Sequence, residues 1–264
     1  MLNPASTGTN SGLLAGKKML VTGIANDQSI AYGCAKAFRA MGAELAITYL
    51  NDKARAHVEP LAQALGAQLF MPLDVTEPAS VDALFAAITA QWGRLDSVLH
   101  SIAFAPKADL QGRLADCSRA GFLTAMDVSC YSFIDLARRA EPLMGQGGTL
   151  FTMSFYGANQ VVDNYNVMGP VKAALESAVR YLARELGPQG IRVYAVSPGP
   201  IRTRAASGLA EFDALMERAA AKAPTHSVAS IDDVGQATAL LASDGARMIT
   251  GSTIYVDGGY HIVD

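Results

Sequence analysis

The feature that most constrains the fold of this chain is a regular alternation of apolar, strand-like runs with helix-like segments. Seven such runs occur along the sequence, and each is separated from the next by a helix-like segment. Parallel neighbours in a sheet need crossover connections of this kind, and these crossovers are right-handed. The pattern therefore predicts an α/β fold: a single Rossmann-type, doubly wound parallel sheet of about seven strands with helices on both faces.

The predicted strands span residues 18–22, 44–49, 68–73, 96–101, 148–154, 192–197 and 252–257. The predicted helical segments span 30–41, 53–65, 80–92, 119–144, 171–186, 209–223 and 231–243. In a sheet of this type, ligands bind beyond the carboxyl ends of the strands, at the point where the strand order reverses. We therefore expect the functional residues in the loops that follow the strands.

Composition sets the class of protein. With 264 residues, of which 50% are hydrophobic and 17% charged, the chain suits one large domain whose sheet is buried on both faces. We expect residues 1–12, rich in small polar side chains, to be a flexible leader and residues 13–264 to be a single dinucleotide-binding catalytic domain. This leader lacks the basic start and apolar core of a signal peptide, and no apolar run is as long as a membrane span. A soluble, cytoplasmic protein is the expectation.

Charge and metal-binding patterns exclude several other classes. A net charge of −3 gives no electrostatic footprint for nucleic acid or for an anionic membrane, so neither is an expected partner. Three well-separated cysteines indicate free thiols in a reducing compartment. The four histidines have no metal-ligand spacing, so we expect no protein-built metal site.

The connection between the first strand and the first helix can hold a diphosphate. Gly23 suits a tight turn, Ser29 can cap the following helix, and Ala31 and Gly33 allow that helix to approach the sheet closely. A capped helix N-terminus that points out of a parallel sheet favours an anion. The segment is not a GxGxxG motif, however, and an ordinary βα turn remains the alternative.

The second and third strands bear on which dinucleotide binds. An acidic residue that holds the adenosine ribose often ends the second strand of such folds, but here that strand ends in Tyr49-Leu50-Asn51. No arginine stands at the tip for a 2′-phosphate, although Lys53 and Arg55 follow shortly. NADH is therefore favoured modestly over NADPH. Asp74, after the third strand, can contact the adenine or can cap the next helix; both readings stay open.

Tyr165 and Lys172 are the candidate catalytic pair. Seven residues of α-helix turn through roughly 700°, so the two side chains would lie on nearly one face. An ammonium beside a phenol, whose ordinary pKa is about 10, would lower that pKa and make a usable proton donor. A half-buried tyrosine and a solvated lysine are the alternative. Pro170 fits only the first turn of a helix, and if it lies there the helical geometry is approximate.

Five motifs in one order carry a resemblance to a known family. They are Gly23-x5-Ser29-Ile30-Ala31, His100-Ser101-Ile102-Ala103-Phe104-Ala105-Pro106, Tyr165-Asn166-Val167-Met168-Gly169, Lys172-Ala173 and Gly199-Pro200-Ile201-Arg202-Thr203. Over residues 13–263 the chain resembles the bacterial NADH-dependent enoyl-[acyl-carrier-protein] reductases, a divergent branch of the short-chain dehydrogenase/reductase superfamily. These enzymes use Tyr-x6-Lys, whereas most of the superfamily uses Tyr-x3-Lys. Tyr32 and Lys36 have the commoner spacing, but their place in the first helix argues against catalysis.

The resemblance implies a reaction: hydride from NADH reaches C3 of a trans-2-enoyl thioester, on acyl carrier protein or coenzyme A, in type II fatty acid synthesis. Tyr165 would hydrogen-bond the thioester oxygen as it gains charge, and Lys172 would hold the nicotinamide ribose. The implied cofactor-binding residues are Gly23, Ser29, Ile30, Asp74, Val75, Ile102, Lys172, Ile201, Arg202, Thr203, Arg204 and Ala205. The implied substrate-binding residues are Ala105, Phe155, Tyr156 and Tyr165. A homotetramer is also implied.

Two departures and one segment qualify what the resemblance implies. Phe155 stands where many members carry a second tyrosine, and Leu50 stands where a glutamine often lies near the adenosine. Residues 209–216 correspond to a mobile flap over the acyl chain, or form a surface helix. The alternative functions are a carbonyl or 3-oxoacyl reductase of the same superfamily and a catalytically silent NAD-binding protein.

Overall fold

A seven-stranded parallel sheet forms the centre of the computed structural model, which describes residues 12–203 and 212–263. The strand order is β3-β2-β1-β4-β5-β6-β7, and every pair is parallel. The strands are β1 (Lys18–Thr22), β2 (Glu44–Tyr49), β3 (Leu69–Pro72), β4 (Ser97–His100), β5 (Gly148–Met153), β6 (Ile191–Pro198) and β7 (Ser252–Val256). The predicted doubly wound sheet of seven strands is confirmed, and its order reverses between β1 and β4.

Helices connect the strands. The α-helices are α1 (Ile30–Ala40), α2 (Asp52–Ala64), α3 (Pro78–Trp92), α4 (Lys107–Leu110), α5 (Arg119–Met126), α6 (Ser132–Ala140), α7 (Met168–Leu186), α8 (Phe212–Lys222) and α9 (Ile231–Ala242). A π-helical segment, η2 (Asp127–Tyr131), joins α5 to α6. Short 3-10 segments are η1 (Leu114–Asp116), η3 (Glu141–Leu143), η4 (Tyr156–Ala158), η5 (Gly187–Gln189), η7 (Asp244–Ala246) and η8 (Tyr260–Ile262).

Two hydrophobic clusters cover the two faces of the sheet. One contains buried side chains of α3, α6 and α7, and the other contains those of α1, α2 and α9. Alternate residues of each strand point to opposite clusters: Leu20 belongs to the first, and Met19 and Val21 belong to the second. This is why the strands read as continuous apolar runs rather than as an alternation.

The helix boundaries differ from the predicted ones in three places. The segment predicted as one helix over 119–144 is helical from Arg119 to Leu143 but contains the π turn η2, which sequence periodicity does not reveal. Helix α7 begins at Met168, three residues before the predicted start, so Pro170 lies in its first turn, where a missing N–H is tolerated. The short α4 was not predicted. Residues 209–211 of the predicted flap, and residues 1–11 of the predicted leader, lie outside the described residues.

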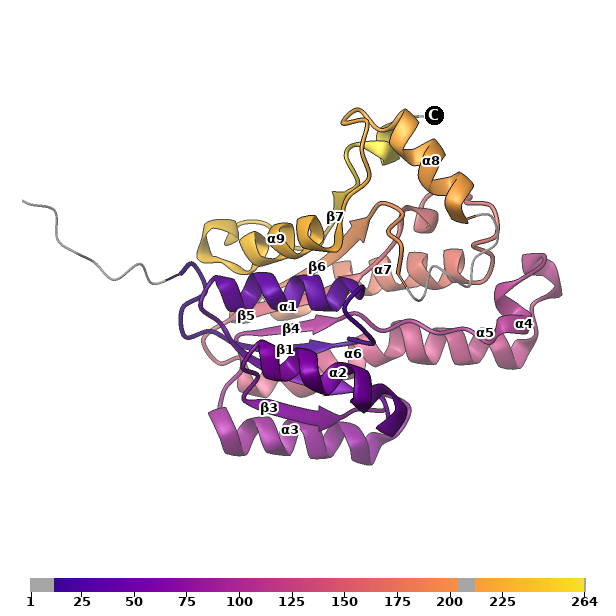
Figure 1. Ribbon diagram of the computed structural model, residues 1–264. Helices are drawn as coiled ribbons and strands as arrows, with labels where there is room; N and C mark the ends of the chain where they lie inside the picture. The colour runs from indigo at the N-terminus through magenta and orange to yellow at the C-terminus, as the bar shows by residue number, and fades with distance from the viewer. Residues whose placement is uncertain (1–11, 204–211, 264) are drawn as a thin grey trace, which may run out of the picture.

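Helices α1 and α9 lie side by side in close contact (Figure 1). A Cβ on Gly33 would lie 2.1 Å from the carbonyl oxygen of Ile231, and a Cβ on Gly235 would lie 2.3 Å from that of Gly33. Gly33 was expected to bring α1 close to the sheet; instead it brings α1 close to α9. Only glycine allows backbones to approach this closely.

The carboxyl ends of the strands point toward the side of the molecule where α4 and α8 lie (Figure 1). The loops that follow β1, β4, β5 and β6 therefore gather at one edge, as the sequence predicted for a parallel sheet. Within the described residues, no helix combines the length and the apolar character that a membrane span requires.

Candidate active site

The turn after β1 has the shape that the sequence predicted. Gly23 has a φ of +90°, and a Cβ there would lie only 2.0 Å from the carbonyl oxygen of Ser101 in the loop after β4. Any larger residue would therefore push apart two loops at the centre of the sheet's carboxyl edge. Gly23 lets the chain leave β1 directly beneath the point where the strand order reverses.

Ser29 holds this turn together, although in a different way from the one predicted. It is the N-cap residue of α1, but its side chain makes no hydrogen bond to the helix. Its Oγ accepts from the backbone N–H groups of Ala25 at 3.0 Å and Asn26 at 3.1 Å, and donates to Oδ1 of Asn26 at 3.2 Å. The cap side chain thus leaves the first amides of α1 to other acceptors, at the positive end of the helix. The turn fits a diphosphate.

Two residues considered for the adenosine end of the dinucleotide, Asp74 and Arg55, are each paired with a neighbour in the sequence. Asp74 accepts from the backbone N–H and the hydroxyl of Thr76, at 2.9 Å and 2.7 Å. The N-cap of α3 is Glu77, so Asp74 does not cap that helix and the capping interpretation was wrong. Arg55 pairs with Glu59 at 3.1 Å, and Leu50 is 56% exposed. Val75 packs against the core cluster of α3, α6 and α7.

The loop after β4 is fastened by the π-helical segment. The hydroxyl of Ser129 accepts from the backbone N–H of Phe104 at 2.9 Å and donates to its carbonyl oxygen at 3.2 Å. Ile102 and Ala105, on either side, pack against the core. π-Helical turns occur mostly at functional sites, and this one holds the loop that was predicted to contact cofactor and substrate.

His100, at the end of β4, is buried and bonded on both ring nitrogens. Nδ1 lies 2.9 Å from the hydroxyl of Thr152, and Nε2 lies 2.8 Å from that of Ser132. Burial first, and the charge of Lys172 second, lower its pKa to about 3. The ring is therefore neutral at physiological pH and acts as a neutral hydrogen-bonding link between β4, β5 and α6.

Lys172 lies inside the protein, on α7. Its side chain is 5% exposed in total, and Nζ donates to the carbonyl oxygen of Met153, the last residue of β5, at 2.7 Å. Burial lowers the pKa of this lysine to about 8, while neighbouring Cys130 and Glu176 act to raise it. The interpretation as a solvated surface lysine is wrong. Lys172 is a buried amine, and its pKa of about 8 means that it gains or loses its proton near neutral pH.

Tyr165 precedes α7 by three residues, so the expected arrangement on one helical face does not occur. Its ring packs against Phe155, with centroids 4.9 Å apart, and a Cβ on Gly157 would lie 2.6 Å from the ring. Burial, and then the charge of Glu176, raise the pKa of the phenol above its ordinary value. This is the opposite of the predicted lowering. The phenol of the free protein remains protonated, and so it can donate a hydrogen bond.

The chain between β5 and α7 presents the two tyrosines differently. Tyr156 is buried and points to the C-terminal segment, where its hydroxyl lies 3.5 Å from that of Tyr260. Phe155 packs between the rings of Tyr156 and Tyr165. Asn166 has a φ of +41°, which is uncommon outside glycine, and its amide donates to the carbonyl oxygen of Leu110 at 2.8 Å. A strained backbone therefore presents Tyr165.

The segment after β6 completes the edge. Ile201 is buried, and Arg202 pairs with Asp213 on α8 at 2.7 Å, both side chains being largely exposed. Thr203 is half-buried, and the predicted cofactor residues Arg204 and Ala205 lie outside the described residues. Arg202 thus connects the predicted cofactor segment to the described part of the predicted flap.

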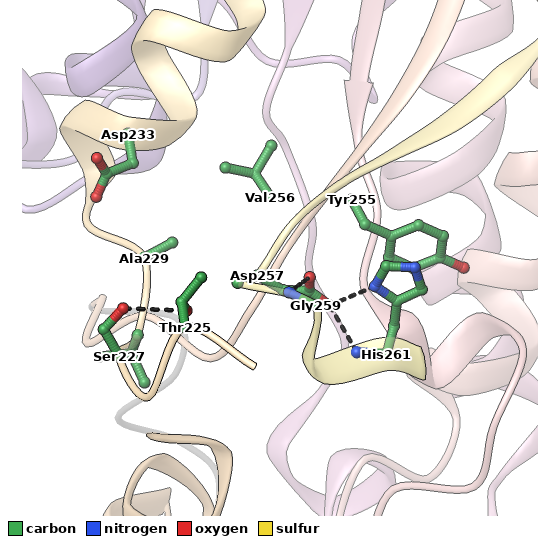
Figure 2. A pocket seen from close by; sticks show the side chains of 11 residues that line it. Thr225, Ser227, Ala229, Asp233, Tyr255, Val256, Asp257, Gly259 and His261 are labelled. Atoms are coloured by element: carbon green, nitrogen blue, oxygen red, sulfur yellow. Dashed lines mark hydrogen bonds and ion pairs between the residues drawn. The ribbon is translucent and has the colours of Figure 1, made fainter. Parts of the chain in front are cut away.

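A pocket of about 440 Å³ lies beside the C-terminal end of β7 and contains none of the predicted site residues (Figure 2). His261 donates its backbone N–H to Asp257 and places Nδ1 2.9 Å from the same carboxylate. This pocket is separate from Tyr165 and Lys172 in its lining. Across the described residues, no group of three or more potential ligands is placed to hold a metal ion.

Three residues of the site were missed in the sequence. Glu176 is buried beside Lys172, Ser129 fastens the β4 loop, and Gly157 makes room for the ring of Tyr165. The spacing of Glu176, four residues after Lys172, placed it on the same helical face and could have indicated it. Nothing local distinguishes Ser129 or Gly157 from other small residues.

The fold and this constellation define a class: an oxidoreductase with a Rossmann-type dinucleotide site, a buried lysine and a protonated phenol. The family described as enoyl-(acyl carrier protein) reductase matches residues 23–261. The chain belongs to this family, as the sequence indicated.

Individual relatives agree. The chain is 47% identical over 253 residues to an NADH-dependent enoyl-[acyl-carrier-protein] reductase of Rhizobium meliloti (strain 1021), covering 96% of this chain and 93% of that one. The structure resembles the enzyme of Anaplasma phagocytophilum in complex with NAD, with a TM-score of 0.92, 49% identity, and coverage of 96% and 97%. It also resembles the Bacillus cereus enzyme with NADP+, with a TM-score of 0.94, 42% identity, and coverage of 96% and 99%.

Proposed function

We propose that Tyr165 and Lys172 carry out in this chain the reaction of its family, the reduction of a trans-2-enoyl thioester by NADH. The activity follows from membership of the family, and residues 13–264 are its single catalytic domain. The observation that supports the two residue roles is the pair itself. Burial raises the pKa of the Tyr165 phenol, and Lys172, separated from it by six residues in the sequence, is a buried amine.

The residues divide the work by position. The Gly23–Ser29 turn and the N-terminus of α1 hold the diphosphate, because their amides and the helix dipole favour an anion. Asp74, Val75, Ile102, Ile201, Arg202 and Thr203 contact the dinucleotide, and the family motif assigns the same role to Arg204 and Ala205, which lie outside the described residues. Lys172 holds the nicotinamide ribose through N–H donors of its ammonium, which among the described residues makes one hydrogen bond, to the carbonyl oxygen of Met153.

NADH, when bound, supplies the hydride that adds to C3 of the substrate. Negative charge then develops on the thioester oxygen, and the protonated phenol of Tyr165 donates a hydrogen bond to it. Such a donor counts most where charge appears during the reaction. Phe155 packs on the ring of Tyr165 and, with Ala105, forms the apolar wall for the acyl chain; Tyr156 supports this wall from behind.

The cofactor is NADH. Arg55, which follows the tip of β2 together with Lys53, is paired with Glu59 in the same helix rather than free for a 2′-phosphate. The acyl group arrives on acyl carrier protein, as the names of the relatives state for those enzymes. Type II fatty acid synthesis in the cytoplasm is the setting.

The assembly is a homotetramer. Several large apolar side chains on α5, the π segment and α7 are exposed in the single chain: Phe122, Leu123, Tyr131 and Tyr181, the last at 70%. Exposure of several large apolar side chains is a feature of surfaces between subunits. Light scattering coupled to size-exclusion chromatography should give four times the mass of the chain; the mass of a monomer at micromolar concentration would contradict this.

The experiment that tests the function follows absorbance of the reduced cofactor with crotonyl-coenzyme A and, separately, acetoacetyl-coenzyme A. Crotonyl-coenzyme A should be reduced with NADH and more slowly with NADPH. Reduction of the 3-oxo substrate alone would contradict enoyl chemistry, and equal rates with the two cofactors would contradict the argument from Arg55.

A further inference from the structure

Glu176 is a buried carboxylate to which the reaction as described gives no role. It lies on α7, is 4% exposed, and follows Lys172 by four residues, so both side chains leave the same face of the helix. Its hydrogen bonds are to neutral groups: Oε1 accepts from the hydroxyl of Ser154 at 2.6 Å, and Oε2 accepts from the amide of Asn159 at 3.0 Å. Burying a carboxylate on neutral partners is costly, so its place requires a reason.

Three consecutive residues at the end of β5 connect Glu176 to the catalytic pair. The carbonyl oxygen of Met153 accepts from Lys172, the hydroxyl of Ser154 donates to Glu176, and the ring of Phe155 packs on Tyr165. Lys172 and Glu176, both on α7, therefore hold the same strand end through hydrogen bonds. Any shift of this strand end moves the ring against which Tyr165 rests.

Asn159 connects Glu176 to a second strand, β7. Its amide nitrogen, which donates to Glu176, also lies 3.1 Å from the hydroxyl of Tyr255 at the end of β7. Residues 154–159, which contain η4, are thus held by Glu176 at both ends. This segment carries Phe155 and Tyr156.

The charge of Glu176 shifts the pKa of three neighbouring side chains. It raises the pKa of Tyr165 and Tyr255, in each case after burial, and opposes the lowering of the pKa of Lys172. The titratable groups that interact with Lys172 from other elements are Cys130 on the π segment and His100 on β4. His100 is neutral and Tyr165 is protonated, and the pKa of Cys130 is raised by burial. Glu176 is therefore the acidic side chain of α7 whose charge acts on Lys172, one helical turn away.

We propose that Glu176 is a positioning residue for the reduction: it fixes the 154–159 segment through Ser154 and Asn159, and its charge sustains the ammonium of Lys172. This inference rests on the proposed role of Lys172 in holding the cofactor. It gives the buried carboxylate a purpose that its neutral partners alone do not.

The test is the pH profile of kcat/KM for NADH-dependent reduction of crotonyl-coenzyme A. In the wild type, activity should fall as pH rises through the pKa of Lys172, near 8. Glu176→Gln keeps the size and removes the charge, so the alkaline limb should move to lower pH by roughly one unit, the lower end of the effect of a nearby charge. Ser154→Ala and Asn159→Ala each remove one hydrogen bond and keep the charge, so their limbs should stay in place.

Glu176→Asp separates the two parts of the proposal and serves if Glu176→Gln does not fold, which circular dichroism would show. The charge remains, so the alkaline limb should stay with the wild type. The shorter side chain cannot reach both Ser154 and Asn159, so kcat should fall several-fold.

Four results would overturn the inference. Two concern the charge: an alkaline limb of Glu176→Gln at the same pH as in the wild type, or an alkaline limb of Glu176→Asp that is displaced. The others are a displaced alkaline limb in Ser154→Ala and an unchanged kcat in Glu176→Asp. A different result marks failure of the proposed function: a wild type that reduces no enoyl thioester. An active wild type without an alkaline limb would overturn the role of Lys172, and the inference with it.

Discussion

The two ends of the site are built by different physical means. At the turn after β1, where we propose that the diphosphate binds, short-range hydrogen bonds among Ser29, Ala25 and Asn26 fix the backbone, and Gly23 allows the close approach of two loops. At the proposed catalytic end, buried ionisable groups fix the backbone instead: Lys172 and Glu176 form hydrogen bonds with Met153 and Ser154 at the end of β5. The first end depends on shape and the second depends on charge.

This difference assigns separate sensitivities to the two ends. Neutral hydrogen bonds and steric fit change little with pH, whereas a lysine with a pKa near 8 changes its charge within the working range. Substitutions at the turn should therefore weaken cofactor binding at every pH, and substitutions at the catalytic end should change how activity and stability respond to pH.

The largest effect is expected for Lys172→Met. Loss of the ammonium should lower kcat/KM by about two orders of magnitude or more, in line with removal of a group that positions the reactants. The folded protein holds the proton of this lysine less tightly than the unfolded chain does. The free energy of unfolding of the wild type should therefore gain a contribution as pH rises from about 8 toward 10.5.

Urea unfolding of Lys172→Met at a series of pH values should lack that gain. An identical alkaline rise in both proteins would assign it to another group and contradict a buried, charged Lys172.

Gly23→Ala should have the next largest effect, at the other end of the site. The added Cβ would meet the carbonyl oxygen of Ser101 at 2.0 Å, with φ at +90°, so NADH binding measured by fluorescence should weaken at least tenfold at every pH. Gly16→Ala is the matched control, because Gly16 also has a positive φ, +72°, but open space around it. Equal losses in the two variants would show that backbone strain, and not the close loop contact, is responsible.

A smaller effect is expected at acid pH, through His100. Its pKa of about 3 lies below the ordinary value of 6.5, so the unfolded chain takes up a proton between these values and the folded protein does not. The stability of the fold should therefore fall as pH drops from about 6.5 toward 3. His100→Gln should flatten this part of the curve in thermal unfolding; an unchanged slope would assign the acid sensitivity to other groups.

The smallest effect is expected for Tyr156→Phe. Its hydroxyl lies against Tyr260, at 3.5 Å, and away from the ring stack that Phe155 makes with Tyr165. Turnover should fall no more than about twofold, and stability should change by about 1 kcal/mol or less. A loss comparable to that of Lys172→Met would place the hydroxyl of Tyr156 on the substrate.

The sequence predicted what depends on local pattern. Neighbouring residues alone indicate the strand runs, the turn at Gly23 and the spacing of Tyr165 and Lys172. The parallel topology follows from the alternation of strands and helices. Burial is not local. The raised pKa of Tyr165 and the lowered pKa of Lys172 arise from elements packed around them, so the direction predicted for the phenol was wrong.

The contacts of the π turn and the hydrogen bonds of Glu176 were not predicted, because they too join residues that are far apart in the sequence. Ser129 is one more small residue in a helical segment until its hydroxyl meets the backbone of Phe104, 25 positions away. Ser154 and Glu176 are 22 positions apart and meet only because α7 packs on the end of β5.

The most direct test of the catalytic assignment compares Tyr165→Phe with the wild type in single-turnover reduction of crotonyl-coenzyme A, with NADH binding measured in parallel. The account predicts a folded variant that binds NADH with nearly wild-type affinity and reduces the substrate more slowly by about two orders of magnitude or more. A variant that retains the wild-type rate would contradict the role of this phenol at the thioester oxygen.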